Sequence, residues 1–143
     1  AGTLRRNFQG FTDDQSEVLV GLGASSVSSF PHLLSQNEKN SGRYRMLTSQ
    51  NALTANRGIP RCADARYRGA VIEQLLCQGR AQLGACLMRE AHASLDPFIE
   101  RGLAAIDHQW LTILPDGLPY ARSIAAIFDV HRNPNKRRFS SAV

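Results

Sequence analysis

The stretch most able to meet a ligand lies near the amino terminus, where polar side chains surround two phenylalanines. Residues 5–12 read Arg-Arg-Asn-Phe-Gln-Gly-Phe-Thr, and a glycine- and serine-rich run follows at 21–28. Glycine lets a backbone come close to a partner because it has no side chain. The two segments together indicate a strand and turn that present polar groups outward, as at the edge of a larger catalytic domain.

The other reactive residue types do not indicate a self-sufficient active site. HExxH, GxSxG, P-loop and CxxxCxxC motifs are absent. The segment Gly21-Leu22-Gly23 lacks the third glycine of a dinucleotide-binding fingerprint and does not open a long helix. The histidines lie far apart, with no carboxylate or cysteine at a ligand spacing: His32, His92, His108 and His131. We therefore predict no catalytic or metal-binding residue in this chain and interpret the histidines as hydrogen-bonded or exposed.

The cysteines favour a reducing compartment. Cys62, Cys77 and Cys86 are odd in number and form no C-x-x-C pair, which argues against a disulfide framework or a zinc site. No apolar run approaches the ~18 residues that cross a membrane, and the first twenty residues lack a secretion signal pattern. We expect a cytoplasmic location and no membrane partner.

The basic balance raises nucleic acid as a partner. The chain of 143 residues has a formal net charge of +5. Much of the excess gathers in an arginine-rich stretch and in a carboxyl-terminal tail: Arg43, Arg45, Arg57, Arg61, Arg66 and Arg68, then Arg132, Lys136, Arg137 and Arg138. We interpret these groups as solvated faces.

The first 60 residues show weak periodicity. Residues 1–12 read as one short strand, and Asp13 or Asp14 could cap a helix through about Leu19. Serine, asparagine and glycine are frequent over 35–60, which predicts a connector loop. Within that loop we expect a short helix inside 44–53 and a small hairpin near Gly58.

From residue 64 the pattern becomes helical. Apolar residues at helical spacing predict a helix from Asp64 that ends before Gly79, then a second short helix around Leu83 and Leu87. A third helix is expected over about 95–104, with Pro97 in its first turn. Two short antiparallel strands (105–106 and 110–114) and a last helix follow.

This element order resembles a winged-helix unit, which opens a second hypothesis of nucleic-acid or protein interaction. The helix over 95–104 would read DNA, yet it carries Asp96, Glu100 and only one cation, Arg101. DNA contacts need cations at the phosphates, so we consider nucleic acid an unlikely partner. The predicted fold class is mainly α with a small β-hairpin: a winged-helix-like helical domain preceded by a remnant strand of a missing barrel.

Several segments resemble the C-terminal part of the oxygen-independent coproporphyrinogen III oxidases, radical S-adenosylmethionine enzymes of haem synthesis. The resemblance lies in seven stretches spread along nearly the whole chain: residues 6–12, 22–28, 35–37, 68–77, 102–103, 122–129 and 139–143. It implies a parent enzyme with an N-terminal barrel that holds a [4Fe-4S] cluster and S-adenosylmethionine. That barrel is absent from this sequence, and its cluster cysteines would lie upstream of Cys62.

The resemblance also implies site residues. Two positions that contact a second S-adenosylmethionine in the family match Gln9 and Val27. A glutamine amide can donate and accept hydrogen bonds, and a small apolar side chain can pack against the ligand. Arg43, Arg61 or Arg68 could attract the carboxylates of a porphyrinogen substrate, which arginine binds with paired hydrogen bonds.

We therefore expect four segments: a barrel-edge and cofactor-facing segment (1–34), a connector loop (35–60), a winged-helix-like domain (61–132) and a basic tail (133–143). The parent enzyme would decarboxylate coproporphyrinogen III oxidatively to protoporphyrinogen IX, and this fragment alone would be inactive. Its partners would be the missing barrel and the porphyrinogen. Two alternatives stay open, a winged-helix interaction or nucleic-acid-binding module and a related radical-S-adenosylmethionine haem chaperone.

Overall fold

A computed structural model describes residues 3–7 and 10–132 of the chain. The chain separates into two compact units, Ala1–Tyr67 and Arg68–Val143, and each is described by itself. Two features predicted from the sequence lie outside the described residues: the cofactor contact Gln9 and the basic tail (133–143).

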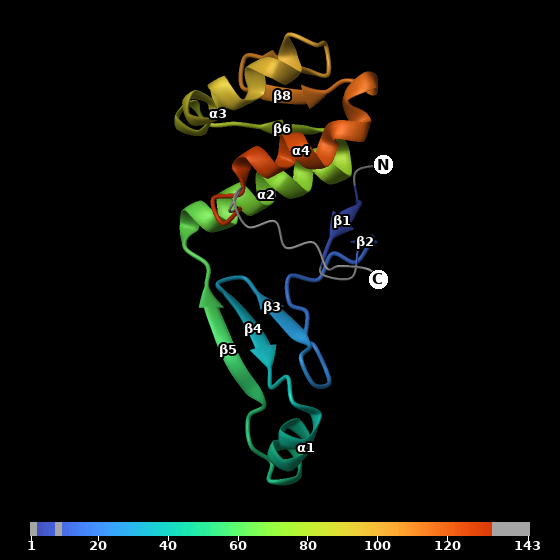
Figure 1. The fold of residues 1–143 in the computed structure, drawn as a ribbon, viewed down its shortest axis with the longest axis vertical. Coiled ribbons are helices and arrows are strands. Elements are labelled where there is room, and N and C mark those ends of the chain that lie inside the picture. Colours follow the sequence, from blue (N-terminus) through green and yellow to red (C-terminus); the bar gives the residue numbers. More distant parts are fainter. Residues whose placement is uncertain (1–2, 8–9, 133–143) are drawn as a thin grey trace, which may run out of the picture. The chain divides into compact units, whose positions relative to one another are not determined.

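The first unit is made mainly of strands. Its described part contains five strands and a helix: β1 (Arg5–Arg6), β2 (Phe11–Thr12), β3 (Val27–Phe30), β4 (Leu33–Asn37), α1 (Ser41–Ser49) and β5 (Ala55–Pro60). β1 and β2 form an antiparallel hairpin, and β3, β4 and β5 form an antiparallel sheet in that order (Figure 1). A single antiparallel bridge joins Leu19 to Ser29, so the extended segment before the glycine run lies along the outer side of β3.

Three expectations for this unit are wrong. The region 35–60 is not a connector loop, because it contains most of β4, all of α1 and all of β5. Residues 1–12 contain a hairpin rather than one strand, and 13–19 are not helical. Asn40 caps α1, since its Oδ1 accepts from the Arg43 N–H at 2.9 Å. Turn-forming residues here serve as caps and strand ends.

The second unit combines helices with a three-stranded sheet. Its elements, with α2 starting at the end of the first unit, are α2 (Ala63–Gln78), β6 (Arg80–Gln82), α3 (Ala85–Ile99), β7 (Ala104–Asp107), β8 (Trp110–Ile113), the 3-10 helix η1 (Pro115–Tyr120), α4 (Ala121–Ala125) and the 3-10 turn η2 (Ala126–Phe128). The antiparallel sheet has the order β6-β8-β7. The predicted hairpin is confirmed, with Ala105 opposite Thr112 and Asp107 opposite Trp110.

The helices of this unit differ from the prediction in two places. The second and third expected helices are one continuous helix, α3, and Pro97 lies near its carboxyl end. A proline there removes one helical N–H close to the terminus, where few further bonds depend on it. The expected helix over 64–78 is present, and Gly79 follows it with a positive φ of 72°. The sequence favours Asp64 as the N-cap residue of this helix. In the structure α2 begins one residue before Asp64, and the Sγ of Cys62 accepts from the Ala65 N–H at the helix start.

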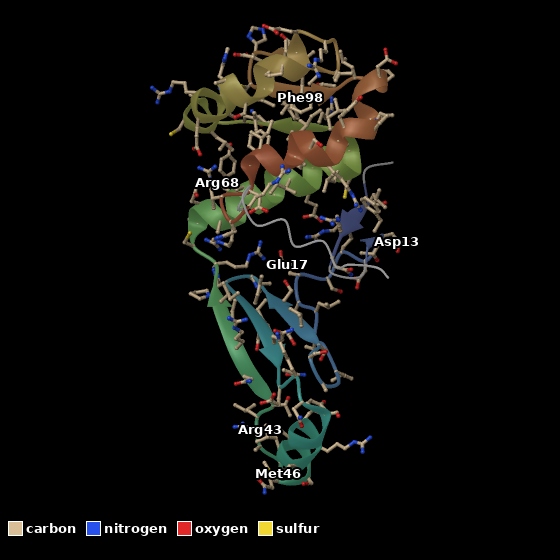
Figure 2. The ribbon with its side chains drawn as sticks, in the orientation of Figure 1. Asp13, Glu17, Arg43, Met46, Arg68 and Phe98 are labelled. Carbon is tan, nitrogen blue, oxygen red and sulfur yellow. The ribbon has the colours of Figure 1, made fainter. Side chains whose placement is uncertain are left out.

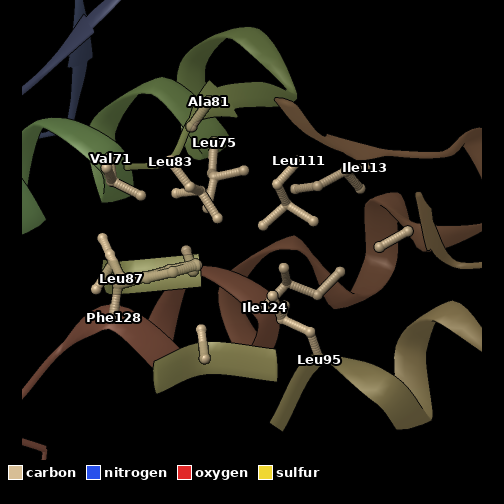
Figure 3. Packing of buried hydrophobic residues seen from close by; sticks show 13 residues of the cluster. Val71, Leu75, Ala81, Leu83, Leu87, Leu95, Leu111, Ile113, Ile124 and Phe128 are labelled. Atoms are coloured by element: carbon tan, nitrogen blue, oxygen red, sulfur yellow. The ribbon is translucent and has the colours of Figure 1, made fainter. Parts of the chain in front are cut away.

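The apolar core lies within the second unit. Figure 3 shows 13 buried residues, most of them from α2, α3, α4, η2 and the sheet. Leu75, Leu95, Leu111 and Phe128 are among them, and these four are almost fully shielded from solvent. By contrast, the described residues of the first unit include no buried apolar side chain, and its two buried residues are the polar Ser28 and Glu38. The first unit therefore gains little of the hydrophobic free energy that stabilises the second.

The fold class is confirmed only at a coarse level. The described chain has four α-helices and three small antiparallel sheets, so its β content exceeds the single expected hairpin. Within the described residues, no helix has the length and apolarity needed to cross a membrane.

Candidate functional site

A loop over residues 21–26 connects the extended segment to β3, and the side chain of Asn37 holds it in place. Asn37 Nδ2 donates to Gly21 O, Gly23 O and Ser26 Oγ, each at 3.1 Å. An amide nitrogen has two hydrogens, so three acceptors at this range share them. Asn37 lies at the bulged end of β4, and its Oδ1 accepts from Thr54 Oγ1 at 3.1 Å. One side chain thus fixes both ends of the loop.

The glycines in the loop have different roles. A Cβ on Gly21 would lie 2.5 Å from Val27 O, so glycine is required there to let the loop lie against β3. Gly23 has a φ of 106°, and a Cβ on it would face open space. The Gly23 N–H donates to Tyr44 Oη of α1 at 3.0 Å. The expected close approach of glycine therefore occurs within the chain itself at Gly21, while Gly23 leaves room beside it.

Glu38, next to Asn37, is buried and already satisfied. Its Oε1 accepts from the Asn40 N–H at 3.1 Å, and its Oε2 accepts from Asn56 Nδ2 at 3.2 Å. Arg43 Nε lies 3.4 Å from Glu38 Oε2. These contacts tie α1 to β4 and β5, so Glu38 is a structural carboxylate.

Val27 is one of the two predicted cofactor contacts. It begins β3 directly after this loop and is half-buried. It pairs with Gln36 of β4, and Gln36 pairs with Arg57 of β5. Residues directly opposite each other in antiparallel strands share a face of the sheet. The sheet therefore presents Val27, Gln36 and Arg57 as one row. Whether Gln9 lies near this row is outside the described residues, and its role stays a prediction.

The arginines expected to attract carboxylates are mostly engaged. Arg68 donates from both terminal nitrogens to the Glu90 carboxylate, at 3.0 and 2.6 Å, and its side chain is largely buried. Arg43 faces Glu38, as described above. Figure 2 shows Arg43 extending from the region of α1 and Arg68 from α2. The paired guanidinium of Arg68 is a structural link between α2 and α3 and does not belong to a solvated face.

The histidines and cysteines do not gather into a reactive cluster. Arg66 Nη1 lies 2.9 Å from His32 Nδ1, and His92 lies 3.1 Å from Asp96 one turn along α3. Across the described residues, no group of three or more His, Cys, Asp or Glu side chains could hold a metal ion.

Hydrogen bonds from the Ser16 hydroxyl and N–H lower the pKa of the Asp14 carboxyl, which is fully exposed.

Comparison with known proteins finds relatives along nearly the whole chain. No protein-family model matches the chain. A Bradyrhizobium diazoefficiens protein named oxygen-independent coproporphyrinogen III oxidase is 37% identical over 99% of the chain, and one of the same name from Cereibacter sphaeroides is 38% identical over 90%. The chain is homologous to the C-terminal part of these oxidases. It spans about a third of their length, 33% and 30% respectively.

A solved structure agrees with this assignment. The Escherichia coli coproporphyrinogen III oxidase, described as a radical SAM enzyme, matches with a TM-score of 0.84 and 28% identity over 92% of this chain and 32% of its own. The resemblance inferred from the sequence motifs is thereby confirmed.

The network around Asn37 was missed by reasoning from sequence. Gln36, Asn37 and Glu38 follow Leu33, Leu34 and Ser35 in a region rich in turn formers, and that composition predicts a loop. Each of these polar residues in fact closes a local contact: to Ser25 O, to the glycine loop and to the start of α1, respectively. A short apolar pair followed by four polar residues was the available signal for a strand that ends in a polar network.

Proposed function

We propose that this chain is a functional C-terminal part of an oxygen-independent coproporphyrinogen III oxidase. The parent enzyme would convert two propionate side chains of coproporphyrinogen III to vinyl groups by oxidative decarboxylation, which gives protoporphyrinogen IX. The observation that carries the proposal is the 37% identity over 99% of the chain to a relative of that name. The fold match to a radical SAM enzyme supports the same assignment.

S-adenosylmethionine and a [4Fe-4S] cluster would supply one-electron chemistry in the parent enzyme. The described cysteines do not suit cluster ligation: Cys62 and Cys86 are exposed and belong to no ligand group. We therefore assign the cluster to residues outside this chain. The start of β3 suits S-adenosylmethionine better, because half-buried Val27 offers an apolar contact beside the polar loop.

We assign Gln9 and Val27 to that cofactor site. The role of this chain's residues would be to bind and orient the ligand: Val27 by packing, Gln9 by hydrogen bonds, and the loop over 21–26 by a backbone shape that Asn37 fixes. Isolated from the rest of the enzyme, the chain would be inactive.

The edge of the first unit supports a partner supplied by the missing N-terminal part. The Leu19 N–H and C=O both bond to Ser29, so the neighbouring Val18 and Val20 groups face away from β3. Within the described residues those outward groups have no hydrogen-bond partner, and the side chains of Val18, Val20 and Leu22 are exposed. An open, apolar sheet edge favours pairing with a further strand.

For the second unit we propose a winged-helix-like arrangement. That arrangement fits the chain order of the elements, α2, β6, α3, β7 and β8, and the position of β8 between β6 and β7 in the sheet. The single helix α3 stands where a winged helix has two helices. We also propose that 61–132 functions as one domain, and that the enzyme is cytoplasmic, since free cysteines suit a reducing compartment.

A hybrid oxidase tests the proposal. It consists of the N-terminal part of the Bradyrhizobium relative followed by this chain in place of that relative's own C-terminal third. We expect the hybrid to restore anaerobic growth without added haem to cells that lack their own enzyme, whereas this chain alone does not. Failure of a well-expressed hybrid, when the intact relative succeeds, would contradict the proposal; haem transfer without porphyrinogen oxidation would indicate a haem chaperone.

Replacing Asn37 with alanine in the hybrid is expected to loosen the loop over 21–26. The substitution removes every hydrogen bond that Asn37 Nδ2 donates to that loop, and each such bond contributes about 0.5–1.5 kcal/mol. Hydrogen exchange of the Ser25 and Ser26 amides should accelerate by roughly tenfold or more.

Ser35→Ala is the matched control for Asn37, because Ser35 lies on the same strand and its side chain makes no hydrogen bond among the described residues. Unchanged loop exchange in the Asn37 variant would show that the network does not hold the loop.

A further inference from the structure

We propose that Arg57 binds a carboxylate group of the ligand held at the Val27 face of the β3-β4-β5 sheet. This inference rests on the proposed function, and it adds a charged contact to a site so far described only by an apolar residue and an amide. Neither the resemblance nor the comparisons assign a role to Arg57.

The register of the sheet places Arg57 in the same row as Val27. Val27 pairs with Gln36, and Gln36 pairs with Arg57, so all three side chains share one face. Neighbouring strands lie about 4.8 Å apart, which separates the backbones of Val27 and Arg57 by roughly 10 Å. A ligand longer than that separation can contact Val27 at one end and Arg57 at the other.

The charge of Arg57 is not neutralised by the sheet. β3, β4 and β5 contain no acidic residue. In the described part of the chain, the side chain of Arg57 makes no hydrogen bond or ion pair, and the residue is exposed on β5. Nearby arginines differ, because Arg43 faces Glu38 and Arg66 contacts His32. Arg57 is therefore available for an anion.

The neighbouring row completes an amphipathic surface. A second row of paired residues lies two positions further along each strand: Ser29, Leu34 and Ile59. Because residues two apart in a strand point to the same side, this row shares the face of Val27 and Arg57. Ile59 is exposed although it is large and apolar. Gln36 Nε2 donates to Ser25 O at 3.0 Å, which leaves its Oε1 to accept from a ligand. An apolar strip beside a guanidinium suits an organic ligand that ends in a carboxylate.

Two ligands of the proposed enzyme carry such a group. S-adenosylmethionine has an α-carboxylate, and coproporphyrinogen III has propionates. Arginine binds either one with paired, charge-assisted hydrogen bonds. The shared chemistry is an aliphatic carboxylate, and the source is decided by two separate measurements.

Arg57→Gln in the hybrid oxidase is the test variant, with Arg57→Lys to keep the charge and Arg45→Gln as a control. Arg45 is also an exposed arginine, but it lies on α1 and not on the sheet. One measurement is the Kd for S-adenosylmethionine by equilibrium dialysis without substrate. The other is the KM for coproporphyrinogen III at saturating S-adenosylmethionine.

We expect Arg57→Gln to raise either the Kd or the KM by roughly tenfold or more, because a charge-assisted hydrogen bond to the ligand is lost. The kcat should stay nearly unchanged. Arg57→Lys should recover part of the loss, and Arg45→Gln should match the unsubstituted hybrid. A change in the Kd identifies the cofactor carboxylate, and a change in the KM alone identifies a propionate.

Values within twofold in both measurements for Arg57→Gln would overturn the inference and leave the proposed function intact. An unsubstituted hybrid that neither binds S-adenosylmethionine nor turns over would instead overturn the proposed function, and this inference with it.

Discussion

Replacing Phe128 with alanine is expected to lower the free energy of unfolding of the second unit by about 3–5 kcal/mol. Phe128 is 1% exposed and ends η2 within the cluster that α2, α3, α4 and the sheet share. Removing the ring leaves a cavity between elements that cannot all move to fill it. Urea unfolding of the chain, followed by the signal of Trp110 on β8, measures the change.

Val130→Ala is the matched control for Phe128. Val130 lies two residues further on and is 57% exposed. Its truncation should alter the free energy of unfolding by less than about 0.5 kcal/mol. Equal effects of the two substitutions would show that the cluster around Phe128 is not the core of the unit.

The two units of the isolated chain are expected to differ strongly in hydrogen exchange. Amides of β8 should be protected by a factor of roughly 10³ or more, because opening them requires unfolding of the buried cluster. Amides of β3 and β4 should exchange with factors below about 10², since no buried apolar residue among the described ones supports their sheet. Exchange followed by mass spectrometry resolves both sets.

The hybrid oxidase supplies the comparison for this difference. There, the amides of β3 and β4 should gain protection if the N-terminal part covers the open edge near Val20 and the exposed apolar side chains, as we propose. Equal protection of the two units in the isolated chain would show instead that the first unit is stable without a partner.

The sequence predicts the second unit better than the first because its elements bury regular apolar stripes. Val71 and Leu75 repeat at helical spacing in α2, and Leu111 and Ile113 alternate in β8. The presence of the hairpin and the position of Gly79 after α2 follow from similar local signals. Local sequence divides α3 in two because Pro97 favours a first turn, whereas in the structure it lies near the carboxyl end of one helix.

In the first unit, side-chain periodicity carries less information. All six residues of β5 are exposed, so no alternation of buried and exposed positions marks it as a strand. β5 is set by backbone pairing with β4, which local sequence does not reveal. The row of Val27, Gln36 and Arg57 could not be predicted for the same reason. Val27 and Arg57 are 30 residues apart in the sequence, and only the strand register brings them into one row. The resemblance to the family predicts a cofactor contact at Val27 without that geometry, and this role stays a prediction.

Anaerobic turnover by the purified hybrid oxidase tests most directly whether this chain completes a coproporphyrinogen oxidase. With its [4Fe-4S] cluster reconstituted and S-adenosylmethionine and a reductant added, the hybrid should convert coproporphyrinogen III to protoporphyrinogen IX, detected by chromatography after oxidation to the porphyrins. The N-terminal part without this chain should give no product. A folded hybrid that carries the cluster yet forms no protoporphyrin, alongside an active intact relative, would contradict the assignment.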